Sequence, residues 1–479
     1  MTSTPGERGF LTQHNRVTTE HPLACTLAAE GPEGWRRVDA VFAVTVVGEI
    51  GQLVYSDGER VVPMSPPETV LALVRELRVD AARFSTGPWW RMLLVLASSG
   101  ELEIDYDYGE EPFPSSQMFT PEAYRADLEA YPRDNVPVWL AAYIGHGDRQ
   151  LRSPQVAAAQ ARADRAERVW AVLAENEFPP FPVMWARWAT ISAAFVAAKS
   201  DWGPRMLPWT GVFEGSGRGG STLYALPAGR GVLSGGVWNA PTLDAVYNGG
   251  APMPKLYAGA PDWVVDSVLN PRTASGLLSF CYWWEAGRWY RGQSPGAGDC
   301  ATALPGVWTG DTTIGIVARL VADDSDNDAS EAIAALLAAA ETGSVTRATL
   351  AEVFGDDGRF DIDGALYQYS AAGLVSTTPE PMPAEEAIAR VRDYITGRGL
   401  DTSGYPLSQL VADRFDVGWM VYVPVAEDEI AIGRAIFYIG DDGVLEPSSS
   451  SIAPGIYIDD FTQRFSERHG SVAGSGSKE

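Results

Sequence analysis

The sequence contains few histidines and cysteines and lacks any long apolar run. No stretch of about 18 apolar residues, the length that spans a bilayer, occurs in its 479 residues. The first 24 residues include Arg8, His14, Arg16 and Glu20 and no continuous apolar segment, so we expect no secretory signal. These absences predict a cytoplasmic chain that has no membrane partner.

The spacing of the cysteines and histidines in the sequence does not match that of common metal-binding sites or of catalytic sites with a Ser or Cys nucleophile. The three cysteines show no CxxC or Cys/His ligand spacing, so we expect buried thiols, no disulfide framework and no zinc site. The four histidines lie near the termini or at a domain junction, outside any folded pocket that a Ser-His-Asp or Cys-His site needs. We therefore expect no metal, no cofactor, no catalytic residue and no enzyme activity. The residues concerned are Cys25, Cys281, Cys300, His14, His21, His146 and His469.

Negative charge is in large excess, with 62 acidic against 36 basic residues and a net charge of −26. Such a field repels nucleic acid and anionic membranes and accelerates the encounter with a basic partner. Acidity also keeps a protein soluble, so the charge alone leaves both interpretations open. With 46% hydrophobic and 20% charged residues, the composition is typical of folded domains.

The length and the order of elements predict several small α+β domains in series, with antiparallel sheets and packed helices. In the first domain, residues 36–62 favour two strands joined by a turn at Asp57-Gly58, followed by a helix from Pro67. Two strands around a Ser-Ser-Gly turn and two helices complete it. The predicted segments are a first domain at 1–150, a Trp- and Gly-rich α+β domain at 151–322, a helical connector and linker at 323–383, a last α+β domain at 384–470 and a disordered tail at 471–479.

The later domains are less regular in pattern. A helix is expected over about 154–175, and then short β-like runs such as STLYAL, LLSFCYWW and TIGIVARLV favour strands separated by long ordered loops. The acidic stretch 322–331 predicts a boundary. Helices are expected at AIAALLAAA and TLAEVF, whereas GRFDIDGALYQY is ambiguous. In the last domain we expect a helix carrying Ile388, Val391 and Ile395, three strands and a closing helix.

An alternating acidic segment at 101–108 is the strongest local signal. Successive side chains on a strand point to opposite faces, so acids every second residue stand in a row about 6.6 to 6.8 Å apart. A Lys/Arg-rich partner would relieve their mutual repulsion, whereas the alternative is a solvated face of an edge strand. Glu101, Glu103, Asp105 and Asp107 share one face, Leu102, Ile104, Tyr106 and Tyr108 the other, and Glu110 and Glu111 extend the acidic run.

This first region resembles a known family. A strand-rich start, the helix at Pro67, Trp89-Trp90 entering a strand, the segment ELEIDYDYGEEPF and Trp139 are similar to the YezG-like immunity proteins of Gram-positive bacteria, over about residues 36–145. The resemblance implies an antagonist of secreted, nuclease-type toxins. It makes the acidic residues and Tyr106 and Tyr108 candidate partner contacts.

The last domain resembles a second family, the immunity protein 35 family. The matching features are the helix AEEAIARVRDYI, a Gly-Trp pair entering a strand at 418–422, the turn at 440–443 and the closing IYIDDF. The resemblance adds Trp419, Asp441 and Asp442 as candidate partner contacts. Two such modules imply a polyimmunity protein that binds and neutralises polymorphic toxin domains, which we expect to be basic.

The middle domain leaves two other functions open. Its tryptophans suit either a core or a stacking platform for a sugar or base. Paired carboxylates there would serve an enzyme that needs no histidine. The glycine run 215–221 favours a hairpin loop, because it lacks the Lys-Ser/Thr of a phosphate loop. The tryptophans are Trp202, Trp209, Trp238, Trp283, Trp284 and Trp289, and the carboxylates are Glu214, Asp244, Asp262, Asp266 and Glu285.

Overall fold

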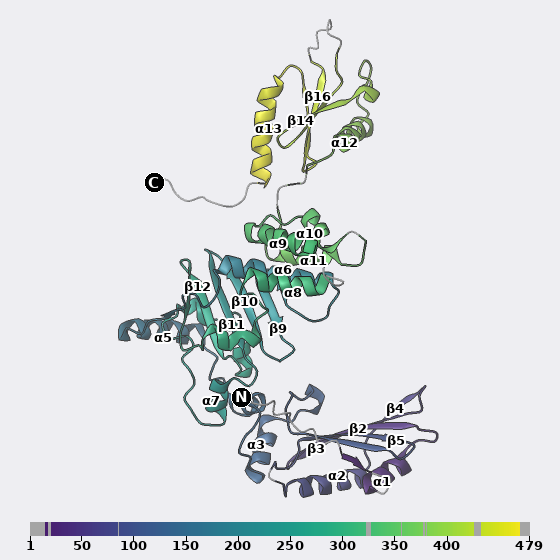
Figure 1. The fold of residues 1–479 in the computed structure, drawn as a ribbon, viewed down its shortest axis with the longest axis vertical. Helices are drawn as coiled ribbons and strands as arrows, with labels where there is room; N and C mark the ends of the chain where they lie inside the picture. Colours follow the sequence, from purple (N-terminus) through teal and green to yellow (C-terminus); the bar gives the residue numbers. More distant parts are fainter. Residues whose placement is uncertain are drawn as a thin grey trace. The chain divides into compact units, whose positions relative to one another are not determined.

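The computed structural model describes residues 15–17, 21–84, 86–321, 327–355, 357–376, 379, 381–425 and 433–469. Over these residues the chain is α+β with three separate antiparallel sheets, as predicted (Figure 1). It divides into two compact units, Met1–Trp188 with Trp202–Thr312, and Ala189–Asp201 with Thr313–Glu479. The first two sheets belong to the first unit and the third sheet to the second.

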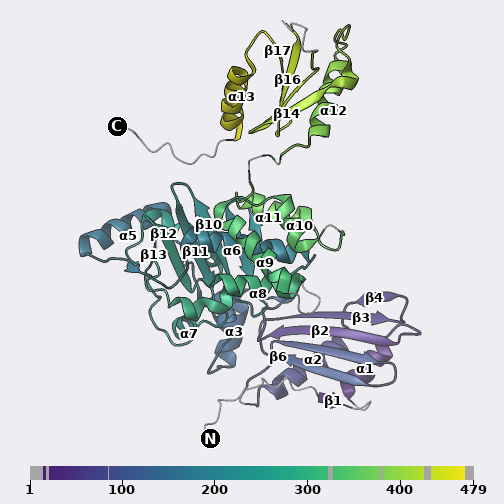
Figure 2. The ribbon, with the colours of Figure 1, turned by 45° about the horizontal axis from the view of Figure 1, so that its top comes forward.

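The first sheet has the strand order β1-β6-β5-β2-β3-β4 and is antiparallel throughout. Two helices pack on one of its faces, as Figures 1 and 2 show, and bury Leu23, Leu27, Val70 and Val74 against it. Burial of each such side chain stabilises the domain by about 1.5–3 kcal/mol. The elements are β1 (Asn15–Val17), α1 (Pro22–Glu30), β2 (Arg37–Thr45), β3 (Gly48–Ser56), β4 (Val61–Met64), α2 (Glu68–Ala81), β5 (Arg91–Ala97) and β6 (Leu102–Asp107).

The stretch expected to be one long strand before the Asp57-Gly58 turn is in fact a hairpin, and that prediction was wrong. β2 and β3 pair from Thr45 and Gly48 outward, with Val46 and Val47 exposed in the turn between them. A continuous β-branched run hides this turn in the sequence. A distant residue holds it, because the N–H of Val46 donates to Asp127 Oδ1 at 3.0 Å.

Helices α3 (Pro121–Ala130) and α4 (Val138–Gly145) close the first domain, as predicted, with a 3-10 turn η1 (Ser115–Gln117) before them. They pack around an aromatic cluster built on Trp90, Phe113, Tyr124 and Trp139. Beneath it, Asp127 is fully buried and accepts two hydrogen bonds from the guanidinium of Arg78, at 2.7 and 2.8 Å.

The second sheet has seven antiparallel strands in the order β7-β13-β12-β11-β10-β9-β8. The loop that joins β9 and β10 spans residues 215–219 of the glycine run 215–221, and Gly220 and Ser221 begin β10, so the predicted hairpin loop is confirmed. The elements are α5 (Pro154–Glu167), β7 (Val172–Leu173), α6 (Phe181–Ala197), β8 (Arg205–Leu207), β9 (Thr210–Glu214), β10 (Gly220–Leu226), β11 (Arg230–Gly236), α7 (Pro241–Tyr247), η2 (Asp262–Val265), η3 (Pro271–Ser275), β12 (Phe280–Glu285), β13 (Arg288–Arg291) and η4 (Ala297–Ala303).

Two helices, α6 and α8 (Gly310–Val321), depart from the prediction. α6 was missed because it is apolar nearly all round and lacks the polar stripe of a surface helix; Met184, Trp188 and Ala193 are fully buried. The run TIGIVARLV was expected to be a strand and is α8 (Gly310–Val321). Its start is set by a side-chain cap, because the N–H of Thr312 donates to Thr309 Oγ1.

The second unit continues with three more helices, α9 (Asn327–Thr342), α10 (Arg347–Phe354) and α11 (Ile362–Ala371). The first two confirm the predicted helical segments. The ambiguous segment becomes α11, which Asp361 caps by accepting from the N–H of Gly364 at 2.9 Å. Much of the predicted boundary, part of the linker and the tail lie outside the described residues.

The third sheet has the order β14-β15-β16-β17. It lies between two helices on opposite faces (Figure 1), where Val391 and Ile395 pack on one side and Phe461 on the other. The polar strand β14 was not predicted. The elements are α12 (Ala384–Gly397), η5 (Leu407–Gln409), β14 (Val411–Phe415), β15 (Gly418–Tyr422), β16 (Ala435–Gly440), β17 (Leu445–Ser449) and α13 (Pro454–His469).

Candidate partner-binding site

The acidic segment lies on the face of the first sheet opposite α1 and α2. Leu102 and Ile104 are buried beneath the helices, whereas Glu101 and Glu103 are exposed on the other side. The predicted alternation is therefore confirmed for this strand. We call the face of the first sheet that lies opposite α1 and α2 the outer face. Its side chains are those of Arg37, Asp39, Val41, Ile50, Gln52, Val54, Arg91, Leu93, Val95, Glu103, Asp105 and Asp107.

The strand register places acidic and apolar side chains side by side on the outer face. Directly opposed residues of neighbouring strands share a face and lie within side-chain contact distance. The rows across β6, β5 and β2 are Glu103, Val95 and Asp39; Asp105, Leu93 and Val41; and Asp107, Arg91 and Ala43.

The apolar middle of the outer face is partly exposed. Val41, Leu93 and Val95 retain part of their surface, in contrast to the fully buried Leu94 and Leu96 next to them. α1 and α2 leave this side of the sheet open, whereas at one end Arg91 donates to Gln117 of η1 and lies over the ring of Phe113. An apolar strip rimmed by charge is the usual composition of a protein-binding surface.

Arg37 and Asp39 form an exposed ion pair at one end of the outer face. Arg37 Nε and Nη2 donate to the two carboxylate oxygens at 2.8 and 2.5 Å. The hydrogen bond and the charge of Asp39 raise the pKa of the Arg37 guanidinium, and the charge of Glu103 adds to the effect. A cation therefore stands near the acidic row, which the sequence did not suggest.

Asp105 presents an unsatisfied acceptor in the middle of the acidic row. Its Oδ1 is buried and accepts no hydrogen bond within the described part of the chain. The side chain stands opposite Leu93, and Leu93 stands opposite Val41, so apolar neighbours replace water around it. A buried acceptor without a donor costs about 1–3 kcal/mol, and a donor from another molecule would recover it.

Asp107 ends the acidic row and is engaged within the domain. Its Oδ2 accepts from Arg91 Nε and Nη2 at 2.9 and 2.6 Å, and its Oδ1 accepts from the N–H of Gly109 at 2.8 Å. Both members of the ion pair are about seven-eighths buried. Asp107 thus holds the end of β6 in place, in addition to any contact with a partner.

The two predicted tyrosines lie on the helix side of the sheet. Tyr106 stacks on Trp89 with ring centroids 6.0 Å apart, and both Tyr106 and Tyr108 pack against the core beneath α2. Burial raises the pKa of Tyr106. The structure therefore separates these aromatic residues from the exposed acids of the same strand.

Glu110 and Glu111 follow the strand and are exposed. Glu110 accepts from the N–H of Tyr108 at 3.3 Å. Glu111 forms an ion pair of 2.5 Å with Arg218, whose guanidinium lies over the ring of Trp238. Glu111 thus links the first domain to the loop before β10.

The three candidate residues of the last domain take part in its internal contacts. Asp441 has a side chain only 6% exposed, and it accepts from both terminal nitrogens of Arg414 and from the N–H of Met382. Trp419 Nε1 donates to the carbonyl of Met382 at 2.6 Å, with Arg414 over its ring. Asp442 Oδ1 accepts from the N–H of Val444 at 3.1 Å.

The structure adds functional candidates that the sequence analysis missed. Asp39, Val41, Leu93 and Val95 join Asp105 on the outer face although they lie on three strands. The signal available in the sequence was the alternation VDAVFAV, which places Asp39 and Val41 on the face away from Val38 and Ala40.

In the middle domain, the structure favours a core over a stacking platform. Trp283, Trp284 and Trp289 are at most 9% exposed, whereas Trp202 and Trp209 are more than 60% exposed. Of the carboxylates considered for an enzyme, Glu214 pairs with Arg272 at 2.6 Å. The others lie on different segments, with Asp244 on α7, Asp262 on η2, Asp266 just after η2 and Glu285 at the end of β12.

The predictions about cysteine hold in part. Cys281 and Cys300 are buried, and burial raises the pKa of each thiol, whereas Cys25 is exposed on α1.

Within the described ranges there is no cluster of His, Cys, Asp and Glu side chains able to hold a metal ion. In the same ranges no helix is both long and apolar enough to cross a bilayer.

Comparison with known proteins adds no relative. No protein-family model matches the chain, and no curated protein matches it. The fold, the outer face and its register are therefore the observations from which a function is inferred.

Proposed function

We propose that this chain is an immunity protein of the polyimmunity type, which acts in the cytoplasm by binding and neutralising basic, nuclease-type toxin domains. The outer face of the first sheet is the proposed contact surface. Its acids would pair with the Lys and Arg residues that such a toxin uses to hold nucleic acid. The bound protein would then block access to the toxin's active site.

The observation that carries this proposal is the unsatisfied Asp105 Oδ1 between apolar neighbours on an uncovered, acid-rimmed sheet face. A face that served only to be solvated would keep such an oxygen in contact with water. A lysine or arginine donor from a partner would complete the site. The apolar strip of Val41, Leu93 and Val95 would be buried in the same contact.

Two further features support the proposal. The net charge of −26 accelerates the encounter with a cationic partner. In toxin–inhibitor complexes, close charge pairs across the interface contribute about 1.5 to 7 kcal/mol each. The resemblance of the first and last domains to two immunity families supports the same function, and the last domain would bind a second toxin type.

Replacing the acids that face outward tests the proposal. Glu101, Glu103 and Asp105 are changed together to Gln, Gln and Asn, and Asp107 is left intact because it holds Arg91. A control triple variant, Glu59→Gln, Glu76→Gln and Glu129→Gln, removes the same charge from exposed positions off the outer face. Each protein is co-expressed with the toxin domains encoded beside its gene, and growth is scored.

The parent protein and the control variant should protect cells, and the outer-face variant should not. In binding measurements the outer-face variant should lose at least about tenfold in affinity, which is about 1.4 kcal/mol, and much of the salt dependence. Equal protection by the two triple variants would show that the outer face is merely solvated. Failure of the parent to neutralise any neighbouring toxin would overturn the function itself.

A further inference from the structure

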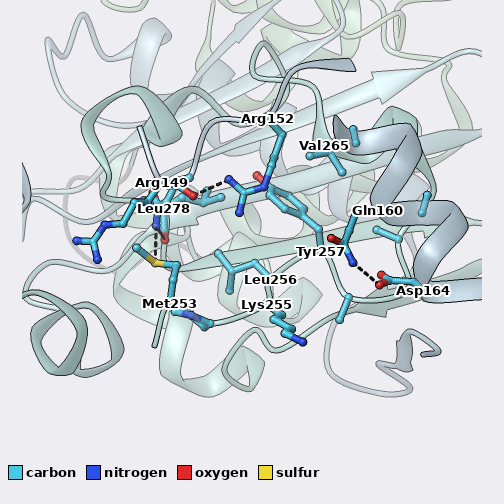
Figure 3. Close-up of a pocket in the computed structure, with 16 residues that line it drawn as sticks. Arg149, Arg152, Gln160, Asp164, Met253, Lys255, Leu256, Tyr257, Val265 and Leu278 are labelled. Carbon is cyan, nitrogen blue, oxygen red and sulfur yellow. Dashed lines mark hydrogen bonds between the residues drawn. The ribbon is translucent and has the colours of Figure 1, made fainter. Parts of the chain in front are cut away.

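A cavity of about 330 Å³ lies in the first unit (Figure 3), and none of the residues that line it belongs to the outer face. One wall is α5, and the other is the segment 253–260 that precedes η2. The volume is at the lower end of the range for small-molecule sites. Apolar side chains line much of it, namely Ala157, Ala161, Met253, Leu256, Ala260, Val265 and Leu278.

Hydrogen bonds from both sides fix the walls of this cavity. Gln150 is buried and exchanges two hydrogen bonds with the backbone of Leu278, at 2.8 and 3.0 Å. Asp164 accepts from Gln160 at 2.7 Å and from the N–H of Gly259 at 2.9 Å. The cavity is therefore preformed rather than a gap between loose segments.

Gly259 is required for one of these contacts. Its φ of +71° favours glycine, and a Cβ at this position would collide with the backbone at Ala171. The close approach brings segment 253–260 against the chain that follows α5. A glycine at position 259 therefore allows this wall of the cavity to pack closely against the residues that follow α5.

Three cations line the cavity in a chain that is otherwise strongly acidic. Arg149, Arg152 and Lys255 all contribute, and none forms an ion pair within the described residues. Asp164 is the one carboxylate in the lining, and both its oxygens already accept hydrogen bonds. The cavity therefore presents net positive charge to an entering molecule.

Arg152 and Tyr257 provide the donors for an anionic group. Arg152 uses Nη1 for the carbonyls of Arg149 and Leu151, which leaves Nε and Nη2 available. The Tyr257 hydroxyl is buried and has no hydrogen-bond partner in the described chain. Figure 3 shows the Tyr257 ring directed toward the Arg152 side chain. Burial raises the pKa of Tyr257, so its hydroxyl keeps its proton and donates at neutral pH.

The other two cations have different positions. Arg149 donates to the carbonyls of Gly145 and His146 and lies over the ring of Tyr247, so its guanidinium is held away from Arg152 (Figure 3). Lys255 is exposed, as Arg152 also is, and adds charge at the mouth. The anionic group would therefore be bound by Arg152 and Tyr257, with Lys255 contributing through its field.

We propose that this cavity binds a small organic carboxylate with an apolar body. The carboxylate would accept hydrogen bonds from Arg152 and from the Tyr257 hydroxyl. The apolar body would lie against Ala157, Ala161 and Val265. This site is separate from the outer face and does not depend on the function proposed for it.

Calorimetric titration of the full chain tests the proposal with two matched pairs of probes, phenylacetate with phenylacetamide and octanoate with octanamide. The two members of each pair share one apolar body, and the amide replaces the anionic carboxylate by a neutral group of similar size. At least one carboxylate should bind with a Kd below about 1 mM, and its amide should bind at least tenfold more weakly. If neither carboxylate binds, or if the amides bind equally well, the proposal is overturned.

Substitutions then locate the site. Arg152→Gln should weaken carboxylate binding at least tenfold, and Tyr257→Phe and Lys255→Gln should weaken it several-fold. Arg162→Gln and Arg165→Gln are controls, because both are exposed on α5 and neither lines the cavity. Equal losses in the controls would show a general charge effect and contradict the assignment. Tyr257→Phe removes a single oxygen, so it keeps the test valid if a charge variant folds poorly.

Discussion

The first and the last sheets of this chain differ in how many faces their helices cover. α1 and α2 both pack on one side of the first sheet, whereas α12 and α13 pack on opposite sides of the last. The first sheet therefore keeps a face on which Asp105, Leu93 and Val41 stand side by side and partly exposed. The last sheet keeps no such face within the described residues.

This difference changes the role of acidic residues that look alike in the sequence. Glu101 and Glu103 are exposed. Asp441, which directly follows β16, is also acidic, yet it is buried and holds Arg414 and the backbone of Met382. Side-chain burial, rather than charge, separates the candidate binding residues from the structural ones.

The largest expected effect concerns an acid that is buried in the first domain itself. Asp127→Ala removes the partner of Arg78 and acceptors for Trp90 Nε1 and the N–H of Val46. Because it leaves a buried guanidinium unpaired, the free energy of unfolding of this domain should fall by about 3–5 kcal/mol. Hydrogen exchange of the backbone amides of β2 and β5 measures this loss in the free energy of unfolding. Unchanged exchange would show that the pair is not the support that its burial indicates.

Truncation of apolar residues compares the uncovered face with a covered one. Ile439→Ala, in the fully buried core of the last sheet, should cost about 2–5 kcal/mol. Leu93→Ala, on the outer face, should cost less than Ile439→Ala, because part of the Leu93 side chain is already in contact with water. Urea unfolding followed by hydrogen exchange in each domain separates the two. Equal losses would mean that the outer face is covered in the free protein.

The acids allow a matched comparison within the last domain. Asp441→Asn should lower its free energy of unfolding by about 1–3 kcal/mol, because the buried amide cannot accept from Arg414 and Met382 as the carboxylate does. Asp393→Asn, on the exposed surface of α12, should change it by less than about 0.5 kcal/mol. Hydrogen exchange of the β16 backbone amides measures the change in the free energy of unfolding for both variants. If the two variants behave alike, Asp441 is free to bind a partner after all.

The elements that the sequence predicted correctly are those whose apolar residues recur at the regular spacing of a helix or a strand. Val70 and Val74 of α2, and Leu102 and Ile104 of β6, repeat at the spacing of a helix and of a strand. α6 has no polar stripe and was missed for that reason. The hairpin at Val46 was missed because a residue 81 positions away helps to hold its turn.

The same limit applies to the candidate site. The face that Glu103 and Asp105 share follows from alternation within one strand and was predicted. Their neighbours Leu93 and Val95 come from the pairing of β5 with β6, which the local pattern does not specify. The cavity beside α5 was not foreseen at all, because Arg152 and Tyr257 are about a hundred residues apart in the sequence.

The smallest expected effect is a pH response confined to the first domain. His21 caps α1 by accepting from the N–H of Leu23 through Nδ1, and burial lowers its pKa below the ordinary 6.5. As the pH falls through about 6.5, the unfolded chain takes up a proton on His21 before the folded chain does. The folded state therefore loses stability on acidification and keeps its full stability above pH 6.5.

His21→Asn keeps a capping side chain without a group that titrates in this range. Between pH 7.5 and 5.5 the parent should lose more stability in α1 than this variant does. The difference should be a fraction of the 1.4 kcal/mol that one full pKa unit represents, since His21 is only partly buried. The N-cap residue of α12 is Pro383, which makes no side-chain cap, so the amide exchange of α12 should be the same in both proteins. A parent and variant with the same pH dependence in α1 would show that His21 does not couple this domain to pH.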